Sequence, residues 1–132
     1  MKNEKPSIRV RLEAKKSGAK PRADVFVAVN ARAYTGDAVA SASVGQIETF
    51  ASQLYAFERS LAGEVVLEAE GLEIRVNAKD TVGHVEVRLS VKQLDDILQT
   101  RFETDPISVA RFADGLLAGL RDSRRIALLD GF

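Results

Sequence analysis

In residues 64–91, EVVLEAEGLEIRVNAKDTVGHVEVRLSV, apolar and polar residues alternate almost without a break. A period of two is typical of a strand with one face in the core and the other in solvent. Glu70-Gly71 and residues 79–82 interrupt the alternation, so the segment predicts three consecutive antiparallel strands. Their inward residues are Val65, Leu67 and Ala69, then Leu72, Ile74 and Val76, then Val85, Val87, Leu89 and Val91.

The loop between the last two of these strands sets their register. A four-residue loop over 79–82 places Arg75 opposite Glu86, and opposite charges stabilise a cross-strand pair. A two-residue loop at Thr81-Val82 instead opposes Arg75 to Arg88 and requires positive φ at two β-branched residues. The sequence therefore predicts the four-residue loop.

Further strands lie on both sides of this segment. SIRVRLEA (7–14) alternates, and DVFVAVNA (24–31) is apolar on both faces, as expected of a central strand. Residues 34–42 continue as a third strand that small residues weaken. LQTRF (98–102) alternates as a last strand, while KQLDDI (92–97) fits either a loop or a short helical turn.

Two helices are predicted from their caps. Ser43 and Gln46 have the spacing of a capping box, and Gly63 is placed to accept a left-handed turn at the end of the first helix. Asp105-Pro106 begins a second helix, because aspartate caps free N–H groups and proline fits the first helical position. The apolar faces are Ile47, Phe50, Ala51, Leu54, Phe57 and Leu61 in the first, and Val109, Phe112, Ala113, Leu116, Leu117 and Leu120 in the second.

Gly115 and Gly119 lie inside the second helix, where each costs about 1 kcal/mol relative to alanine. Close approach of another backbone is the expected compensation. We favour tight packing on the first helix or the sheet over a helix-mediated dimer, since small-residue helix interfaces draw their force mainly from membranes. The arginines of RDSRR (121–125) are interpreted as the end of a helix rather than as a phosphate-binding patch.

Together these elements predict a single α+β domain over residues 1–132. We expect a largely antiparallel sheet of about six to seven strands with two helices packed on one face. The 19 basic and 19 acidic residues balance, so no overall field attracts nucleic acid or an anionic membrane. The chain has no cysteine, and MKNEKPS lacks the apolar stretch of a secretory signal, so a cytoplasmic protein is expected.

The sequence contains few residues that could form a catalytic or metal site. His84 is the sole histidine, and no nucleophile elbow accompanies it. A metal site would have to rely on carboxylates such as Asp80, Glu86, Asp95 and Asp96. We therefore expect no catalytic residues, no cofactor and no metal. Glu68 and Glu73 would face each other across a two-residue turn at Glu70-Gly71, where they could serve as paired acid–base carboxylates or, if exposed, merely repel each other slightly.

The order of elements resembles a known group of proteins. Two N-terminal strands lead to the capped helix SVGQIETFASQLYAFERSLAG (43–63), then to the strands of 64–91, a strand ending in RFETDP (101–106) and a closing helix. Over most of residues 7–120 this layout is similar to the WapI-like immunity proteins of bacterial polymorphic toxin systems.

Three portions carry the resemblance best. They are the apolar spacing from Ile47 to Leu54, the strand GHVEV (83–87), and the junction at 103–105. Relatives often carry aspartate-glutamine at that junction, where this chain has ETDP.

The resemblance implies a protein that neutralises a toxin domain by binding it, without catalysis. Because that family carries no catalytic residues, recognition falls to outward side chains. The sheet face with Glu73, Arg75, His84, Glu86 and Arg88 is the partner-binding surface that we predict. The competing interpretation is that these are ordinary surface ion pairs, each worth about 0–1 kcal/mol.

Two other classes of function stay open. A homo-oligomeric structural or scaffold domain, such as a homodimer, would join through the closing helix or an open sheet edge. It requires Leu116, Leu117 or Leu120 to be exposed in the monomer. An enzyme or ligand-binding domain would use carboxylates around Glu68, Glu73 and Glu86, and requires a concave pocket that holds at least two of them.

Overall fold

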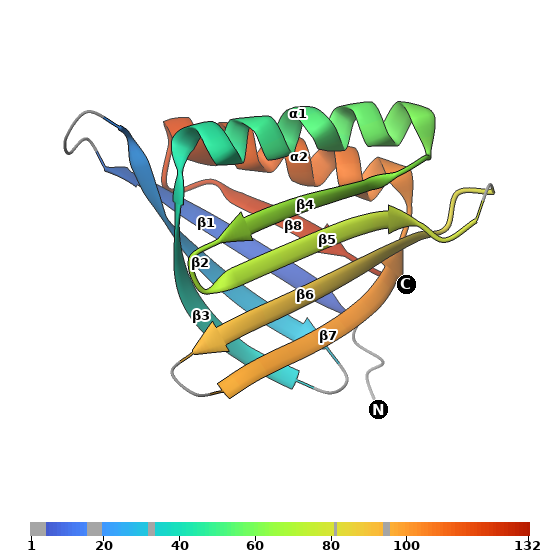
Figure 1. The fold of residues 1–132 in the computed structure, drawn as a ribbon, viewed down its shortest axis with the longest axis horizontal. Coiled ribbons are helices and arrows are strands. Elements are labelled where there is room, and N and C mark those ends of the chain that lie inside the picture. The colour runs from blue at the N-terminus through green and yellow to red at the C-terminus, as the bar shows by residue number, and fades with distance from the viewer. Residues whose placement is uncertain (1–4, 16–19, 32–33, 81, 94–95) are drawn as a thin grey trace.

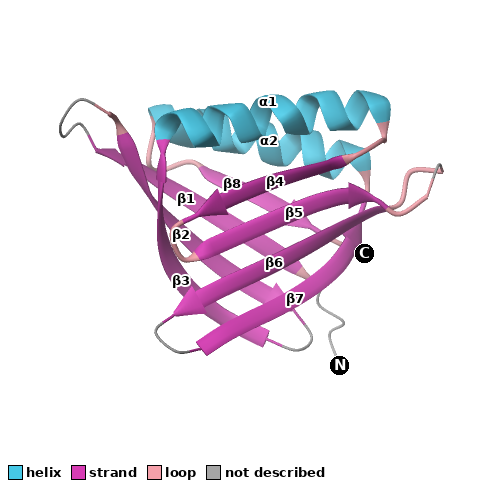
Figure 2. Cartoon of the chain, viewed as in Figure 1, coloured by secondary structure: helices cyan, strands magenta, loops and turns pink. Residues whose placement is uncertain are grey.

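The computed structural model describes residues 5–15, 20–31, 34–80, 82–93 and 96–132, and within them the chain forms eight strands and two helices (Figures 1 and 2). The order is β1 (Ser7–Lys15), β2 (Arg22–Ala31), β3 (Tyr34–Ser43), α1 (Val44–Ser60), β4 (Glu64–Ala69), β5 (Leu72–Ala78), β6 (Val85–Gln93), β7 (Asp96–Thr104), α2 (Pro106–Arg121) and β8 (Ile126–Asp130).

The strands make two antiparallel sheets, in the orders β3-β2-β1-β8 and β4-β5-β6-β7. The fold is thus α+β as predicted, but the expectation of one sheet of six to seven strands is wrong. Helix α1 separates β3 from β4, and β4 begins a second layer whose strands cross those of the first (Figure 1). Both helices run side by side along one edge of the two layers.

The hydrophobic core lies between the inner faces of the two sheets and under both helices. The largest fully buried side chains come from every layer, and they are Phe50, Phe57, Phe112, Ile8, Leu12, Ile47, Leu54, Ile74, Leu116, Leu129, Val10 and Val25. The inward residues predicted from the alternation of residues 64–91 are buried, except that Ala69 is half-buried. Leu117 and Leu120 are also half-buried and pack against the core.

Hydrogen bonds join the two sheets at two corners. Ser41 of β3 and Glu70, just after β4, exchange N–H···O bonds of 3.2 and 2.9 Å. At the other corner the buried hydroxyl of Thr104 donates to the carbonyl of Asp130 at 2.6 Å. The N–H of Phe132 donates to the carbonyl of Glu103 at 3.1 Å, so the C-terminus closes the gap between β7 and β8.

The predicted caps are present at both helix starts. Ser43 and Gln46 form the reciprocal capping box at 3.0 Å each, and Asp105 accepts from the Ser108 N–H at 2.7 Å. The end of α1 differs from the prediction. Its left-handed cap residue is Leu61, with φ 51°, and Gly63 takes a second positive φ two residues later.

Gly115 is where another backbone approaches α2. A Cβ atom built there would lie 2.6 Å from the Cα of Ala127, in β8. The tight-packing interpretation of this glycine is confirmed, although its neighbour is a strand that the sequence analysis did not predict. Gly119 is less crowded, since its nearest neighbour would be the Leu12 side chain at 3.5 Å.

The β5–β6 hairpin corrects the predicted register. Arg75 stands opposite Arg88, and Asn77 opposite Glu86, so the four-residue loop is wrong. The prediction assumed that each arginine needs a carboxylate across the strands. Instead each one bonds a glutamate two residues away in its own strand, which removes the need for a cross-strand partner.

Val82, in the connection between these strands, does not take the positive φ that the two-residue loop requires. Strand pairing stops at Ala78 and Val85, and the Asp80 carboxylate accepts the N–H groups of Val82 and His84 at 2.9 and 3.2 Å. Gly83 supplies a positive φ of 99°. Thr81 lies outside the described residues.

Two other turns can be compared with their predictions. Glu68 and Glu73 face each other across the turn at Glu70-Gly71, as predicted, with Gly71 at φ 89°. Residues 92–97 were expected to form a loop or a helical turn. Their described part is strand, because β6 runs to Gln93 and β7 begins at Asp96, while residues 94–95 lie outside the described residues.

Tyr55 links the two helices, since its hydroxyl donates to the Asp114 carboxylate. Burial and then this hydrogen bond raise the pKa of Tyr55 to about 12. The folded chain therefore holds the phenol proton more tightly than the unfolded chain does. The resulting stabilisation is complete below pH 10, the ordinary pKa of tyrosine, and is lost as the pH rises towards 12.

We expect a phenolate absorbance titration at 295 nm to show one tyrosine that ionises near pH 12 in the native protein. Tyr55→Phe should remove that step and flatten the loss of stability between pH 10 and 12. A wild-type titration with no step above pH 11 would contradict the assigned contact.

Candidate binding face on the β4–β7 sheet

The outer face of the β4–β7 sheet is crossed by neither helix (Figure 1). The antiparallel registers arrange its outward side chains in three rows that run across the four strands. The rows are Glu64, Asn77, Glu86 and Glu103; then Val66, Arg75, Arg88 and Arg101; then Glu68, Glu73, Ser90 and Gln99.

We call Arg75, Arg88 and Arg101 the arginine row. They occupy directly opposed positions on β5, β6 and β7. Like charges in such positions destabilise a sheet. The rows on both sides contain glutamates, so a positive stripe lies between two stripes that carry negative charge.

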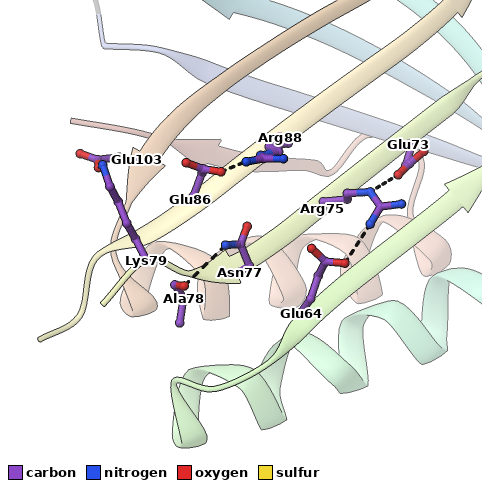
Figure 3. A network of polar contacts seen from close by, with 9 residues as sticks. All are labelled: Glu64, Glu73, Arg75, Asn77, Ala78, Lys79, Glu86, Arg88 and Glu103. Atoms are coloured by element: carbon purple, nitrogen blue, oxygen red, sulfur yellow. Dashed lines mark hydrogen bonds and ion pairs between the residues drawn. The ribbon is translucent and has the colours of Figure 1, made fainter. Parts of the chain in front are cut away.

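Two of the three arginines are held by neighbouring carboxylates, as Figure 3 shows. The Arg75 guanidinium lies between Glu73 and Glu64, with 2.8 Å to the latter. Nε of Arg88 donates to Glu86 at 2.6 Å, and only 15% of the Glu86 side chain is exposed. These contacts fix the arginine head groups, and the bond to Glu73 comes first among the causes that raise the pKa of Arg75.

A hollow of about 460 Å³ lies over the arginine row. Its polar lining consists of Glu73, Arg75, Arg88, Ser90, Gln99, Thr100 and Arg101. Three arginines and one glutamate line the hollow, Glu64 and Glu86 also bond Arg75 and Arg88, and Ser90 and Gln99 add neutral hydrogen-bonding groups. Such a surface is suited to binding an anionic group rather than to acid–base chemistry.

The predicted partner-binding residues divide into two groups. Glu73, Arg75, Glu86 and Arg88 gather on this face, although not in the predicted pairs. His84 was predicted on the outward face of its strand, but it lies in the connection before β6. There its Nδ1 contacts the Asp80 carboxylate, and this contact is the first cause that lowers the pKa of Asp80.

Arg101 is the residue of the face that the predicted set omitted. The alternation of residues 98–102 had already placed it outward. What was missing was the β6–β7 register, because residues 92–97 were not assigned to strands. Glu103, in the same strand as Arg101, is bonded by Lys79 and not by an arginine, and this bond lowers the pKa of Glu103.

The carboxylate alternatives can also be located. Glu68 and Glu73 are opposite each other, but Glu73 is bonded to Arg75. Within the described part of the chain no three histidine, aspartate or glutamate side chains lie close enough to hold a metal ion. Asp80, Glu86 and Asp96 come from three different segments, and Asp95 is not among the described residues.

Comparisons with known proteins add no further assignment. No family model, no curated protein and no solved structure matches the chain. Neither of the helices described here is long and apolar enough to cross a membrane.

Proposed function

We propose that this protein is a non-catalytic binding protein of the immunity type, which neutralises a partner toxin domain in the cytoplasm by covering it. The resemblance to WapI-like immunity proteins supplies the class of function. The observation that carries the proposed surface is the arginine row on a sheet face that no helix crosses. We assign the contact with the partner to this face.

The electrostatics of the face support a role in recognition. Complementary charges across an interface raise the association rate and reject wrong partners more than they add affinity. Arg75 and Arg88 are already fixed by Glu64, Glu73 and Glu86, so little side-chain freedom is lost when they bind. A partner that matches the stripes meets a preorganised pattern.

The proposal is tested by exchanging one ion pair on the face. In the double variant Glu86→Arg, Arg88→Glu the new glutamate stands between Arg75 and Arg101, and the new arginine stands opposite Glu103. Folding should be preserved or improved, because like charges become opposite ones. We expect the melting temperature to be unchanged or higher and the affinity for the toxin domain to fall at least tenfold, by about 1.4 kcal/mol or more.

The matched control is Arg11→Glu, Glu13→Arg, which exchanges a pair with the same spacing on β1 of the other sheet. Tagged wild-type and variant proteins, expressed at native level in their own host, are recovered from lysate and retained proteins are identified by mass spectrometry. Wild type and control should retain a toxin fragment that the β6 variant loses. Recovery of the wild-type protein alone, from cells shown to express the toxin domain, contradicts the proposal.

A homo-oligomer is the second candidate, and the first half of β7 favours it. This strand lies at the edge of its sheet, and its residues Asp96–Gln99 are all exposed. Ile97 is 59% exposed and Leu98 36%, so an apolar edge is open to pairing. The closing helix offers less, because Leu116 is 2% exposed and Leu117 and Leu120 are half-buried against the core, which leaves Ile107 as its exposed apolar residue. Light scattering that shows a monomer at high concentration eliminates this candidate.

A further inference from the structure

The arginine row shows a conflict between stability and charge placement. Its three members stand directly opposite one another on adjacent strands, where like charges destabilise the sheet. Sequences that break a local rule tend to do so at functional sites. The row is open to solvent, and a hollow of about 460 Å³ lies over it. These observations together indicate an anionic ligand.

The hydrogen-bonding capacity of the row is only partly used. Arg88 is engaged through Nε alone, and 57% of its side chain is exposed. The side chain of Arg101 makes no hydrogen bond or ion pair with any residue that the structure describes. A guanidinium group has five N–H donors and binds carboxylates with two of them at once. Arg88 and Arg101 can therefore each donate to a carboxylate without giving up a contact in the fold.

The surroundings of the row select the kind of anion. Glu64, Glu86 and Glu103 follow one side, and Glu68 and Glu73 follow the other. These carboxylates repel an extended polyanion such as nucleic acid, whose charge spreads beyond the row. The row itself spans about 10 Å, two steps between strands, so a single small oxyanion reaches at most two of its three members.

We infer that the arginine row binds an acidic peptide segment, in which carboxylate side chains two residues apart reach Arg88 and Arg101. An extended peptide places such side chains about 7 Å apart on one face. Ser90 and Gln99, opposite each other in the next row, supply neutral hydrogen-bonding groups to its backbone or side chains. The inference rests on the proposed function, because the segment belongs to the bound partner.

The first experiment uses defined probes with the full chain. A blocked five-residue peptide that alternates glutamate and valine is titrated into the ¹⁵N-labelled protein at low ionic strength. The matched peptide carries glutamine in place of glutamate, and inorganic phosphate is titrated at equal ionic strength. We expect amide shifts around Arg88, Ser90, Gln99 and Arg101 with the glutamate peptide, and at least fivefold weaker binding of both other probes.

Arg101→Gln separates binding from folding. The variant should bind the glutamate peptide at least fivefold more weakly. Its melting temperature should stay the same or rise, because repulsion from Arg88 is relieved. A residue kept only for stability would show the opposite pattern. Arg9→Gln, which removes an exposed arginine on β1 of the other sheet, should leave peptide binding unchanged.

Three outcomes overturn the inference. In the first, Arg101→Gln still binds the glutamate peptide as the wild type does. In the second, the glutamine peptide binds as tightly as the glutamate peptide. In the third, phosphate binds as tightly as the glutamate peptide and its binding is lost in Arg101→Gln. If the glutamate peptide does not bind but the exchange of Glu86 and Arg88 still releases the toxin domain, the inference is wrong and the proposed function stands. If the peptide binds and no toxin domain is retained, the proposed function falls and the acidic-peptide site stands.

Discussion

Replacing Gly115 with alanine is expected to lower the free energy of unfolding by about 1–3 kcal/mol, the usual cost of overpacking. Alanine is the better helix former by about 1 kcal/mol, so propensity alone predicts the opposite sign. The new Cβ would lie 2.6 Å from the Cα and 2.9 Å from the Cβ of Ala127. Because the nearest atom is backbone, α2 and β8 must separate. Urea unfolding followed by circular dichroism measures the change.

Gly119 provides the control within the same helix. A Cβ there meets the Leu12 side chain at 3.5 Å, which is ordinary van der Waals contact. Gly119→Ala should therefore keep the gain in helix propensity and raise the free energy of unfolding by up to about 1 kcal/mol. If both alanine variants are stabilised alike, the close approach of α2 to β8 is wrong.

Phe112→Ala is expected to have the largest effect of any change considered, a loss of about 3–5 kcal/mol in the free energy of unfolding. Phe112 is completely buried on the side of α2 that faces the core, where α2 packs on α1, β1 and β8. Removing its ring leaves a cavity that these packed elements cannot easily fill. Urea unfolding should show a lower midpoint, and a variant this unstable should also melt well below the wild type.

Ile107 is the matched control, because it lies in the same helix but is 62% exposed. Ile107→Ala should change the free energy of unfolding by no more than about 0.5 kcal/mol. Equal losses in the two variants would mean that α2 does not present Phe112 to the core.

The candidate site shows how far local pattern reaches. The alternation of residues 64–91 predicted which side chains point outward, because the pleat reverses side-chain direction at every residue. It could not predict which outward residues become neighbours. The β5–β6 register depends on a connection organised by the Asp80 side chain, and on arginines that bond glutamates in their own strands. Arg101 reaches Arg88 only through the pairing of β6 with β7.

Strand β8 was not predicted, for a different reason. Ile126 and Leu128 are apolar, yet they point away from the core and are 56% and 42% exposed. With apolar residues on both faces and only five residues, IALLD carries no clear alternation after the end of a helix. Its position beside β1 is decided by α2, which returns the chain to the first sheet and packs Gly115 on Ala127.

Local sequence is enough to predict the features that depend on neighbours a few residues apart. These are the inward faces of β4, β5 and β6, the turn at Glu70-Gly71, and the caps at Ser43 and Asp105. The division of the strands into two sheets, and the meeting of three arginines on one of them, could not be predicted from local sequence. Strand pairing joins residues far apart in the chain, and its register depends on the packing of the whole core and on side-chain contacts that no local period encodes.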